Sequence, residues 1–343
     1  TASIALLDSL NCVDYLCFGC ETDSIDLLNT VAEILINEPK EYKDLLTINL
    51  KTGISFPKAR AKALDEYFKK YNLDYSLDIN SNKYAKYPSD ITSNSNLDIN
   101  TFINQPNNIL GIEYIKALMR FNSKINPVPL KRLGAGYHSL DTRTKLASAT
   151  GIRTAMANKD NISGLLPDNC LNIIKNHTTI EYNDFSTVLG SKLLSMDTLD
   201  HIEGINQDLS NRIANNKYNF TDIETFIPML QSKNYTYSAI SRALLHIILD
   251  IKTDDIKEFI SNNYVNYAMI LGFNKNTGIL SEINKYTKIP LVSKFATFYK
   301  EADNNQRKML DINLKADNLY RMIYMNKTSE TLPTEFQRQI IIK

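Results

Sequence analysis

The chain has 343 residues, of which 43% are hydrophobic and 22% are charged, and its formal net charge at pH 7 is +1. This length allows two or three domains. The near-zero net charge excludes the class of proteins that attract nucleic acid through a large positive charge over the whole molecule. No apolar run approaches the length of a membrane span and no signal peptide is recognisable, so we expect a cytoplasmic protein without membrane contact.

The first residues predict a helix followed by a strand. Apolar residues at helical spacing indicate the end of a helix over Thr1–Leu10, and VDYLCF indicates a buried strand over Val13–Phe18 with Gly19 directly after it. Cys17 and Cys20 form a C-x-x-C pair without a second pair. Burial is the favoured interpretation, and redox or metal chemistry is the alternative.

Amphipathic helices are predicted over Asp23–Ile36, over Glu41–Leu50, and from Ser55, a cap residue, to Tyr71. The third helix is basic outside its apolar stripe, which indicates a solvated face or, alternatively, an RNA-facing patch. Its basic residues are Lys58, Arg60, Lys62, Lys69 and Lys70. Asn72–Asn104 is rich in Asn, Ser, Asp and Tyr without helical period and predicts a long surface insertion.

The stretch from Gln105 to Met156 organises the chain. Pro106, with Asn107 and Asn108 as cap, predicts a helix start. Its apolar face is predicted to hold Leu110, Tyr114, Ala117, Leu118 and Phe121.

An extended segment, Pro127–Leu133, then delivers Lys131 and Arg132 at its end, and Ser148 and Thr150 open another helix with Arg153 one turn in. In α/β sheets, ligands lie outside the carboxyl ends of the strands, and helix N-termini bind anions. The stretch therefore predicts an anion site.

Two parallel strands do not make a stable sheet by themselves. We therefore expect earlier strands of this sheet to be missing, so that the chain is a fragment or needs a partner to supply them.

From Gly164 onward the pattern is mainly helical. Val265–Lys294 predicts strand, turn, helix and strand, Gln306–Met325 predicts a helix, and the tail is expected to be irregular before Ile340–Ile342. The helices predicted before this unit span Tyr182–Leu194, Gln207–Ala214, Asp222–Gln231 and Tyr237–Ile251.

Several stretches, in a fixed order, resemble the tRNA(Met) cytidine acetate ligase family. They are DYLCFGCE (Asp14–Glu21), GISFPKARAKAL (Gly53–Leu64), PNNILGIEYIKAL (Pro106–Leu118), KRLGAGYHS (Lys131–Ser139), SATGIR (Ser148–Arg153), IEGINQDLSNRI (Ile202–Ile213), SKNYTY (Ser232–Tyr237) and LGFN (Leu271–Asn274).

The resemblance implies an α/β fold with an incomplete Rossmann-like nucleotidyltransferase domain over residues 1–160, with the insertion at 72–104. A mainly helical, RNA-binding domain over 161–262 and a small α/β unit with C-terminal helices over 263–343 are expected to follow. It implies that ATP, with Mg²⁺ as counter-ion, converts acetate to acetyl-adenylate, which acetylates N4 of the wobble cytidine of elongator tRNA(Met). The oligomeric state stays open, with a homo-oligomer as one alternative.

By the same resemblance, three residues match ATP contacts: Gly19, which lets the nucleotide approach the backbone, Asn107, which reaches ribose or base, and Arg132, which suits a phosphate. Alone, Asn107 would be a helix cap and Arg132 a surface residue. Further candidates are Ser148, Thr150 and Arg153 for phosphate, and Lys233 and Arg242 for RNA.

The sequence also departs from the family. The Asn-Pro-Phe-His-x-Gly-His loop, its catalytic signature, is absent, and the four histidines (His138, His177, His201 and His246) include no His-x-x-His pair. Asn234, Ala239 and Met269 stand where the family tends to carry Arg, which weakens the expected RNA contact. We therefore expect this chain alone to be inactive. The alternatives are a non-catalytic RNA-binding protein and an adenylyltransferase acting on a small cofactor precursor.

Overall fold

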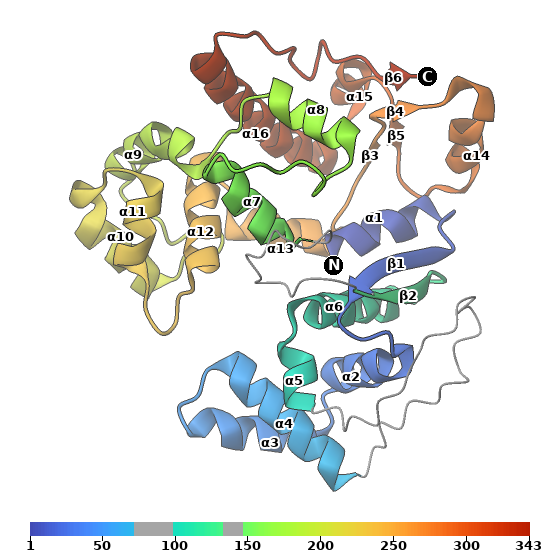
Figure 1. Cartoon of the computed structure of the whole chain (residues 1–343), viewed down its shortest axis with the longest axis vertical. Coiled ribbons are helices and arrows are strands. Elements are labelled where there is room, and N and C mark those ends of the chain that lie inside the picture. Colours follow the sequence, from blue (N-terminus) through green and yellow to red (C-terminus); the bar gives the residue numbers. More distant parts are fainter. Residues whose placement is uncertain (72–98, 133–146) are drawn as a thin grey trace. The chain divides into compact units, whose positions relative to one another are not determined.

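The structure is a computed structural model that describes residues 1–71, 99–132 and 147–343 (Figure 1). The chain forms two compact units. One comprises Thr1 and Val13–Asp168, and the other comprises Ala2–Cys12 and Asn169–Lys343. Helices dominate both units, and each described sheet is a pair of parallel strands, so the α/β class predicted from the sequence is confirmed.

The first unit is built around one pair of parallel strands. β1 and β2 run in register from Tyr15 opposite Asn126 to Cys20 opposite Lys131. The elements of this unit are β1 (Tyr15–Cys20), α2 (Ile25–Asn37), α3 (Lys40–Lys51), α4 (Phe56–Lys70), α5 (Ile99–Asn104), α6 (Pro106–Arg120), β2 (Asn126–Lys131) and α7 (Ala149–Ala157).

The two faces of β1 have different surroundings because successive side chains point to opposite faces. Phe18 and Cys20 are buried, whereas Tyr15, Cys17 and Gly19 are exposed. α6 packs on β1, α2 packs on α6, and α4 packs on α3 and α5. The core of this unit includes Leu28, Val31, Leu64, Phe68, Phe102, Ile103, Ile112 and Ile115.

The structure corrects several predictions in this unit. β1 begins and ends two residues later than predicted, so Gly19 lies inside the strand. Ile99–Asn104, predicted as part of a surface insertion, forms α5, whose Phe102 is 1% exposed. Leu110, predicted on the buried face of α6, is 47% exposed, and the rest of the insertion, 72–98, lies outside the described residues.

The second unit confirms the predicted helices between residues 182 and 251. Leu189, Leu193, Ile213, Phe226 and Ile240 belong to one buried cluster formed by these helices. The helices before the small strands are α1 (Ala2–Leu10), α8 (Asp168–Asn176), α9 (Ser186–Ser195), α10 (Gln207–Asn216), α11 (Ile223–Leu230), α12 (Tyr237–Leu249) and α13 (Thr253–Ser261).

The predicted strand–turn–helix–strand pattern is confirmed in the C-terminal part of this unit. β3 pairs in parallel with β5, and β4 pairs in parallel with β6, so the apolar end of the tail is part of a sheet. The elements are β3 (Ala268–Met269), β4 (Gly272–Phe273), α14 (Ile279–Tyr286), β5 (Leu291–Val292), α15 (Phe295–Glu301), α16 (Asn304–Thr328) and β6 (Ile341–Ile342).

Candidate functional site

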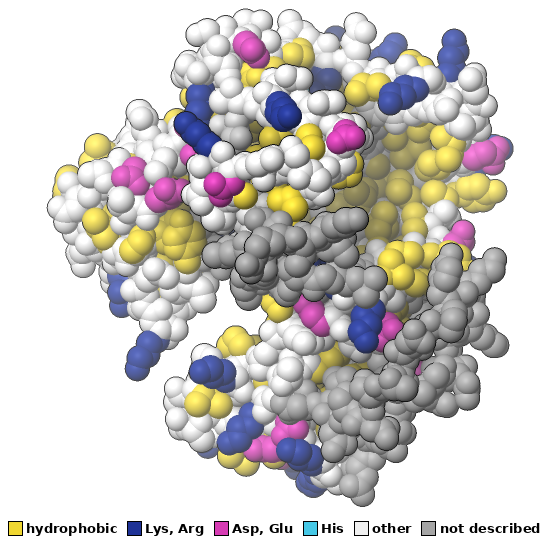
Figure 2. Space-filling model, in the orientation of Figure 1, with side chains coloured by type: hydrophobic (Ala, Val, Ile, Leu, Met, Phe, Trp, Pro, Cys, Tyr) yellow, Lys and Arg dark blue, Asp and Glu magenta, His cyan; other side chains and the backbone are white. Residues whose placement is uncertain are grey.

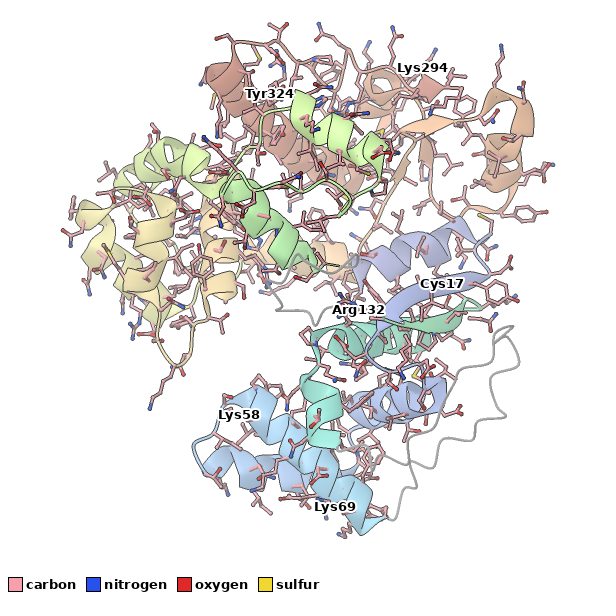
Figure 3. All side chains as sticks on the ribbon, in the orientation of Figure 1. Cys17, Lys58, Lys69, Arg132, Lys294 and Tyr324 are labelled. Atoms are coloured by element: carbon pink, nitrogen blue, oxygen red, sulfur yellow. The ribbon has the colours of Figure 1, made fainter. Side chains whose placement is uncertain are left out.

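The carboxyl end of the β1–β2 sheet brings Gly19 and Arg132 together. The Arg132 amide donates to the carbonyl of Cys20 at 2.8 Å, so the strand pairing continues one residue beyond Lys131. A Cβ atom on Gly19 would lie 3.3 Å from Cγ and 3.7 Å from Cδ of Arg132. The missing side chain at Gly19 therefore leaves room for the stem of Arg132, which lies at the end of β2 (Figure 3).

The Arg132 side chain is exposed and forms no ion pair with any described residue. A guanidinium carries five donors in a planar fork that fits a phosphate or carboxylate. Arg132 can therefore bind an anion at the strand ends without first breaking an ion pair to any residue in 1–71, 99–132 or 147–343.

Asn107 lies at the start of α6, where the carboxylate of Glu21 crosses over from the end of β1. Oε1 of Glu21 accepts from Nδ2 of Asn107 at 2.6 Å and from its backbone amide at 3.4 Å. Oε2 accepts from the backbone amide of Asn108 at 2.9 Å. The two residues joined to Glu21 are the second and third of the helix, after Pro106. Glu21 therefore satisfies amides that a helix leaves without partners inside itself.

Asn108 anchors the same helix end from inside the core. It is 0% exposed, its Oδ1 accepts from the amides of Glu21 at 3.0 Å and Thr22 at 3.3 Å, and its Nδ2 donates to Phe102 O at 3.1 Å and Gln105 Oε1 at 2.7 Å. The prediction that the two asparagines cap their own helix is wrong. The N-cap position is Gln105, which makes no side-chain cap bond, and the cap comes from Glu21.

α6 approaches β1 closely because residue 111 is glycine. A Cβ atom on Gly111 would lie 2.7 Å from Cε2 of Phe18 and 2.8 Å from Sγ of Cys20. The Cys20 thiol also donates to the carbonyl of Asn107 at 3.6 Å. Burial, reinforced by the charge of Glu21, raises the pKa of Cys20 to about 12, so this thiol stays protonated and unreactive near neutral pH.

Cys17 and Cys20 are not placed to form a disulfide with each other or to hold one metal ion together. Cys17 and Cys20 are three residues apart on one strand, so their side chains point to opposite faces, and both thiols are free. Within 1–71, 99–132 and 147–343, no group of three or more His, Cys, Asp or Glu side chains is placed to hold a metal ion. Burial, the favoured prediction, holds for Cys20, whereas Cys17 is exposed.

The predicted phosphate-binding residues stand at the start of α7. Ser148 is the N-cap, and its Oγ accepts from the amide of Gly151 at 2.9 Å, so its hydroxyl serves the helix itself. Thr150 is half-buried, and its Oγ1 accepts from the guanidinium of exposed Arg153 at 3.4 Å. The two predicted sites belong to the same unit, but the segment that joins them, 133–146, lies outside the described residues.

The candidate RNA contacts are on the second unit. Lys233 lies in the turn before α12 and Arg242 lies on α12, and both side chains are exposed without an ion pair in the described chain. The basic residues of α4 in the first unit are more dispersed. Lys58 and Lys69 lie at opposite ends of this helix, Lys69 pairs with Asp65 at 2.7 Å, and acidic side chains lie among the basic ones (Figures 2 and 3). This dispersion favours the solvated-face interpretation.

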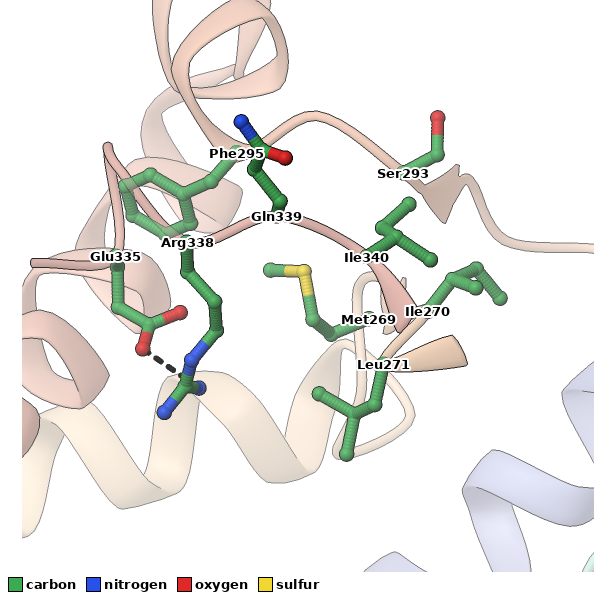
Figure 4. A pocket seen from close by; sticks show the side chains of 9 residues that line it. All are labelled: Met269, Ile270, Leu271, Ser293, Phe295, Glu335, Arg338, Gln339 and Ile340. Atoms are coloured by element: carbon green, nitrogen blue, oxygen red, sulfur yellow. Dashed lines mark ion pairs between the residues drawn. The ribbon is translucent and has the colours of Figure 1, made fainter. Parts of the chain in front are cut away.

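A small cavity in the second unit is not a nucleotide site. Its volume is about 20 Å³, enough for about one water molecule. Glu335 and Arg338 form an ion pair of 2.7 Å in its wall, beside Met269 and Phe295 (Figure 4). Burial raises the pKa of Glu335, although Arg338 opposes this effect.

Known proteins resemble the chain over nearly its whole length. The profile of the HIGH Nucleotidyl Transferase family matches residues 1–335. A Halothermothrix orenii protein named tRNA(Met) cytidine acetate ligase is 31% identical over 94% of this chain and 75% of its own length. A protein of the same name from Thermoanaerobacter sp. strain X514 is 32% identical over 95% of this chain and 76% of its own length. The chain belongs to the tRNA(Met) cytidine acetate ligase family.

The folds agree as well. The crystal structure of Thermotoga maritima TmcAL without ligand has a TM-score of 0.82 and 25% identity, covering 99% of this chain and 79% of that protein. The structure of the same protein bound with alpha-thio ATP has the same TM-score and identity. This chain is therefore a ligase by family, with the nucleotidyltransferase-like fold that the sequence predicted. None of the helices in its described part is long and apolar enough to cross a membrane.

Sequence reasoning missed Glu21, Asn108 and Gly111 as parts of this site. Gly111 carried a usable signal, because a glycine inside an amphipathic helix weakens the helix unless close packing requires it. Glu21 carried no comparable signal, since its partners lie 86 and 87 positions away along the chain.

Proposed function

We propose that this chain binds ATP at the carboxyl end of the β1–β2 sheet, as part of an enzyme that joins acetate to a cytidine of tRNA(Met). The observation that carries the ATP site is that all three candidate residues lie beside the last residues of β1. Gly19 and Arg132 are neighbours, and Asn107 contacts Cys20 and Glu21, the two residues after Gly19. The proposal that acetate and tRNA(Met) are the other substrates rests on the name of the relatives, tRNA(Met) cytidine acetate ligase.

In this proposal the guanidinium of Arg132 binds phosphate, and Asn107 binds the ribose or the base. The start of α7, with Ser148, Thr150 and Arg153, contributes further phosphate contacts. Mg²⁺ accompanies ATP as a counter-ion held mainly by the phosphates, as is usual for this ion.

The proposed chemistry follows from the weakness of acetate as an acyl donor. An acetate oxygen attacks the α-phosphorus of ATP and pyrophosphate leaves, which gives acetyl-adenylate. N4 of the wobble cytidine then attacks the acetyl carbon, AMP leaves, and the amine loses a proton. Cationic donors such as Arg132 offset the charge that develops on the phosphates. In the second unit, Lys233 and Arg242 are the proposed contacts to tRNA phosphates.

Titration calorimetry with ATP tests the nucleotide site. Arg132→Ala should weaken ATP binding about tenfold, the effect of losing one charge-assisted contact. Lys131→Ala is the matched control, because Lys131 is the adjacent exposed cation on β2, and it should bind ATP as the wild type does. Equal losses in both variants would show that only general positive charge matters, and ATP that fails to bind to the wild type would refute the site.

We also propose that this chain alone does not acetylate tRNA(Met), since its histidines include no His-x-x-His pair. Incorporation of labelled acetate into tRNA(Met) above background would contradict this. The same absence favours, as a second candidate, an RNA-binding protein without catalysis. Retardation of tRNA with a steep salt dependence, in a chain that binds no ATP, would support that candidate. The cytoplasmic location and the homo-oligomer stay predictions.

A further inference from the structure

We propose that Glu21 is a positioning residue that turns Asn107 toward the nucleoside end of the nucleotide and directs the triphosphate toward Arg132. This inference rests on the proposed ATP site and assigns an orientation within it.

The argument begins with the orientation of the Asn107 amide group. Its Nδ2 is held 2.6 Å from Oε1 of Glu21. If the amide turned over, its Oδ1 would face the carboxylate, and two acceptors would repel each other. Glu21 therefore selects one of the two amide orientations, in which Oδ1 points away from the carboxylate and remains an acceptor.

The second step concerns which part of a nucleotide can meet this acceptor. Oδ1 requires an N–H or O–H donor, such as an exocyclic amine or a ribose hydroxyl, and phosphate oxygens at neutral pH are mainly acceptors. The N-terminus of a helix such as α6 attracts anions, but here the amides of Asn107 and Asn108 already donate to the carboxylate of Glu21. A phosphate is thus excluded from this helix end.

The third step places the phosphates. Arg132 is the exposed cation next to Gly19, and it is not neutralised by any described acidic residue. A nucleotide at the strand ends therefore has a negatively charged, acceptor-rich boundary at Glu21 and Asn107 and a cationic boundary at Arg132. One orientation satisfies both: nucleoside end to Asn107, phosphates to Arg132.

The test compares ATP with inorganic tripolyphosphate, which has the phosphates but no nucleoside. Each ligand displaces a fluorescent ATP analogue from the wild-type chain, from Glu21→Ala and from Glu21→Gln. In Glu21→Ala, the dissociation constant of ATP should rise about tenfold while that of tripolyphosphate changes less than about twofold. Glu21→Gln keeps the side-chain volume and one acceptor, so it should recover part of the loss and remains usable if the alanine variant fails to fold.

Two further arms make the test specific. Asp303→Asn is the matched control. Asp303, in the other unit, also accepts a hydrogen bond at a helix start, from the backbone amide of Gln306 at 2.8 Å. This variant should leave both dissociation constants unchanged. GTP lacks the 6-amino group of adenine, and 2′-deoxy-ATP lacks the 2′-hydroxyl of ribose, so these analogues identify the group that donates to Asn107. The analogue that lacks this donor should bind the wild type more weakly than ATP does, whereas in Glu21→Ala it should bind as ATP does.

Other outcomes would overturn the proposal. If ATP and tripolyphosphate binding weakened equally, Glu21 would only stabilise the structure and would not orient the nucleotide. If Glu21→Ala bound tripolyphosphate more tightly than the wild type, the start of α6 would be a phosphate site. Unchanged ATP binding in both Glu21 variants, with loss in Arg132→Ala, would refute this inference alone. A wild-type chain that bound no ATP would refute the proposed site and this inference together.

Discussion

Replacing Gly111 by alanine tests whether the close approach of α6 to β1 holds the first unit together. Alanine is the better helix former by about 1 kcal/mol, so the change would stabilise an isolated helix. Here the new Cβ would stand 2.7 Å from Cε2 of Phe18 and 2.8 Å from Sγ of Cys20. Carbon atoms pack at about 3.5–4.0 Å, so the helix or the ring must move by nearly 1 Å.

Overpacking usually costs about 1–3 kcal/mol, and two contacts below 3.0 Å place this change in the upper part of that range, about 2–3 kcal/mol, which exceeds the gain in helix propensity. We therefore expect Gly111→Ala to lower the free energy of unfolding of the first unit by about 1–2 kcal/mol. Because a chain with two units need not unfold in one step, the assay is hydrogen exchange of peptides from α6 and β1 at increasing urea concentrations.

Two variants control this experiment. Gly190→Ala, on α9 of the second unit, places its Cβ 3.1 Å from Cε1 of Phe220. This contact is longer and the ring is only half-buried, so the change should affect stability much less. Phe18→Leu removes the ring atom that Gly111→Ala would strike. Gly111→Ala should therefore cost about 1 kcal/mol less in that background. A Gly111→Ala protein as stable as the wild type, or a cost unchanged by Phe18→Leu, would refute the packing argument.

Two other predictions concern stability. Burial raises the pKa of Cys20 from 9.0, and that of Tyr42 from 10.0, to about 12 in each case. The folded state then binds more protons than the unfolded state over this interval, so the first unit should lose stability between about pH 9 and 12, and Tyr42→Phe should remove part of that loss in urea titrations. In the second unit, Lys308 joins α16 to α13 through Asp255 at 2.6 Å and Glu258 at 2.7 Å, although solvent screens these pairs because the Lys308 side chain is 39% exposed. Lys308→Met should cost about 1 kcal/mol because it leaves the buried carboxylate of Asp255 without a cation, although the backbone amide of Lys252 still donates to its Oδ2 at 3.2 Å. Lys285→Met, whose partner Glu282 is exposed, should cost less than about 0.5 kcal/mol, and equal costs in thermal unfolding would contradict this reasoning.

Periodicity predicted the longer helices well because their buried faces repeat over several turns. α5 was missed since its apolar residues, Ile99, Phe102 and Ile103, span little more than one turn. The end of β1 was placed too early because Gly19 looked like a strand end, while its pairing with Leu130 depends on a segment more than a hundred residues away.

The sequence likewise predicted some residues of the candidate site and missed others. Motif resemblance named Gly19, Asn107 and Arg132. The structure places Gly19 beside Arg132, and it places Asn107 beside Cys20 and Glu21, the two residues after Gly19. The groups that orient them, Glu21 above all, act through contacts between distant segments. No local pattern encodes such contacts, so only the folded chain reveals them.

Asn108 and Gly111 connect the stability of the fold to the geometry of the site. They stand three residues apart, hence on one face of α6, and both are buried. Asn108 ties the helix to the amides of Glu21 and Thr22, and Gly111 sets its distance from Phe18 and Cys20. A helix fixed at two points within one turn can neither slide nor tilt freely against β1. The position of Asn107, the residue before Asn108, is thus determined by the packing of the core. The shift of nearly 1 Å expected in Gly111→Ala should therefore also disturb the 2.6 Å contact between Asn107 and Glu21. This variant should then lose more affinity for ATP than for tripolyphosphate.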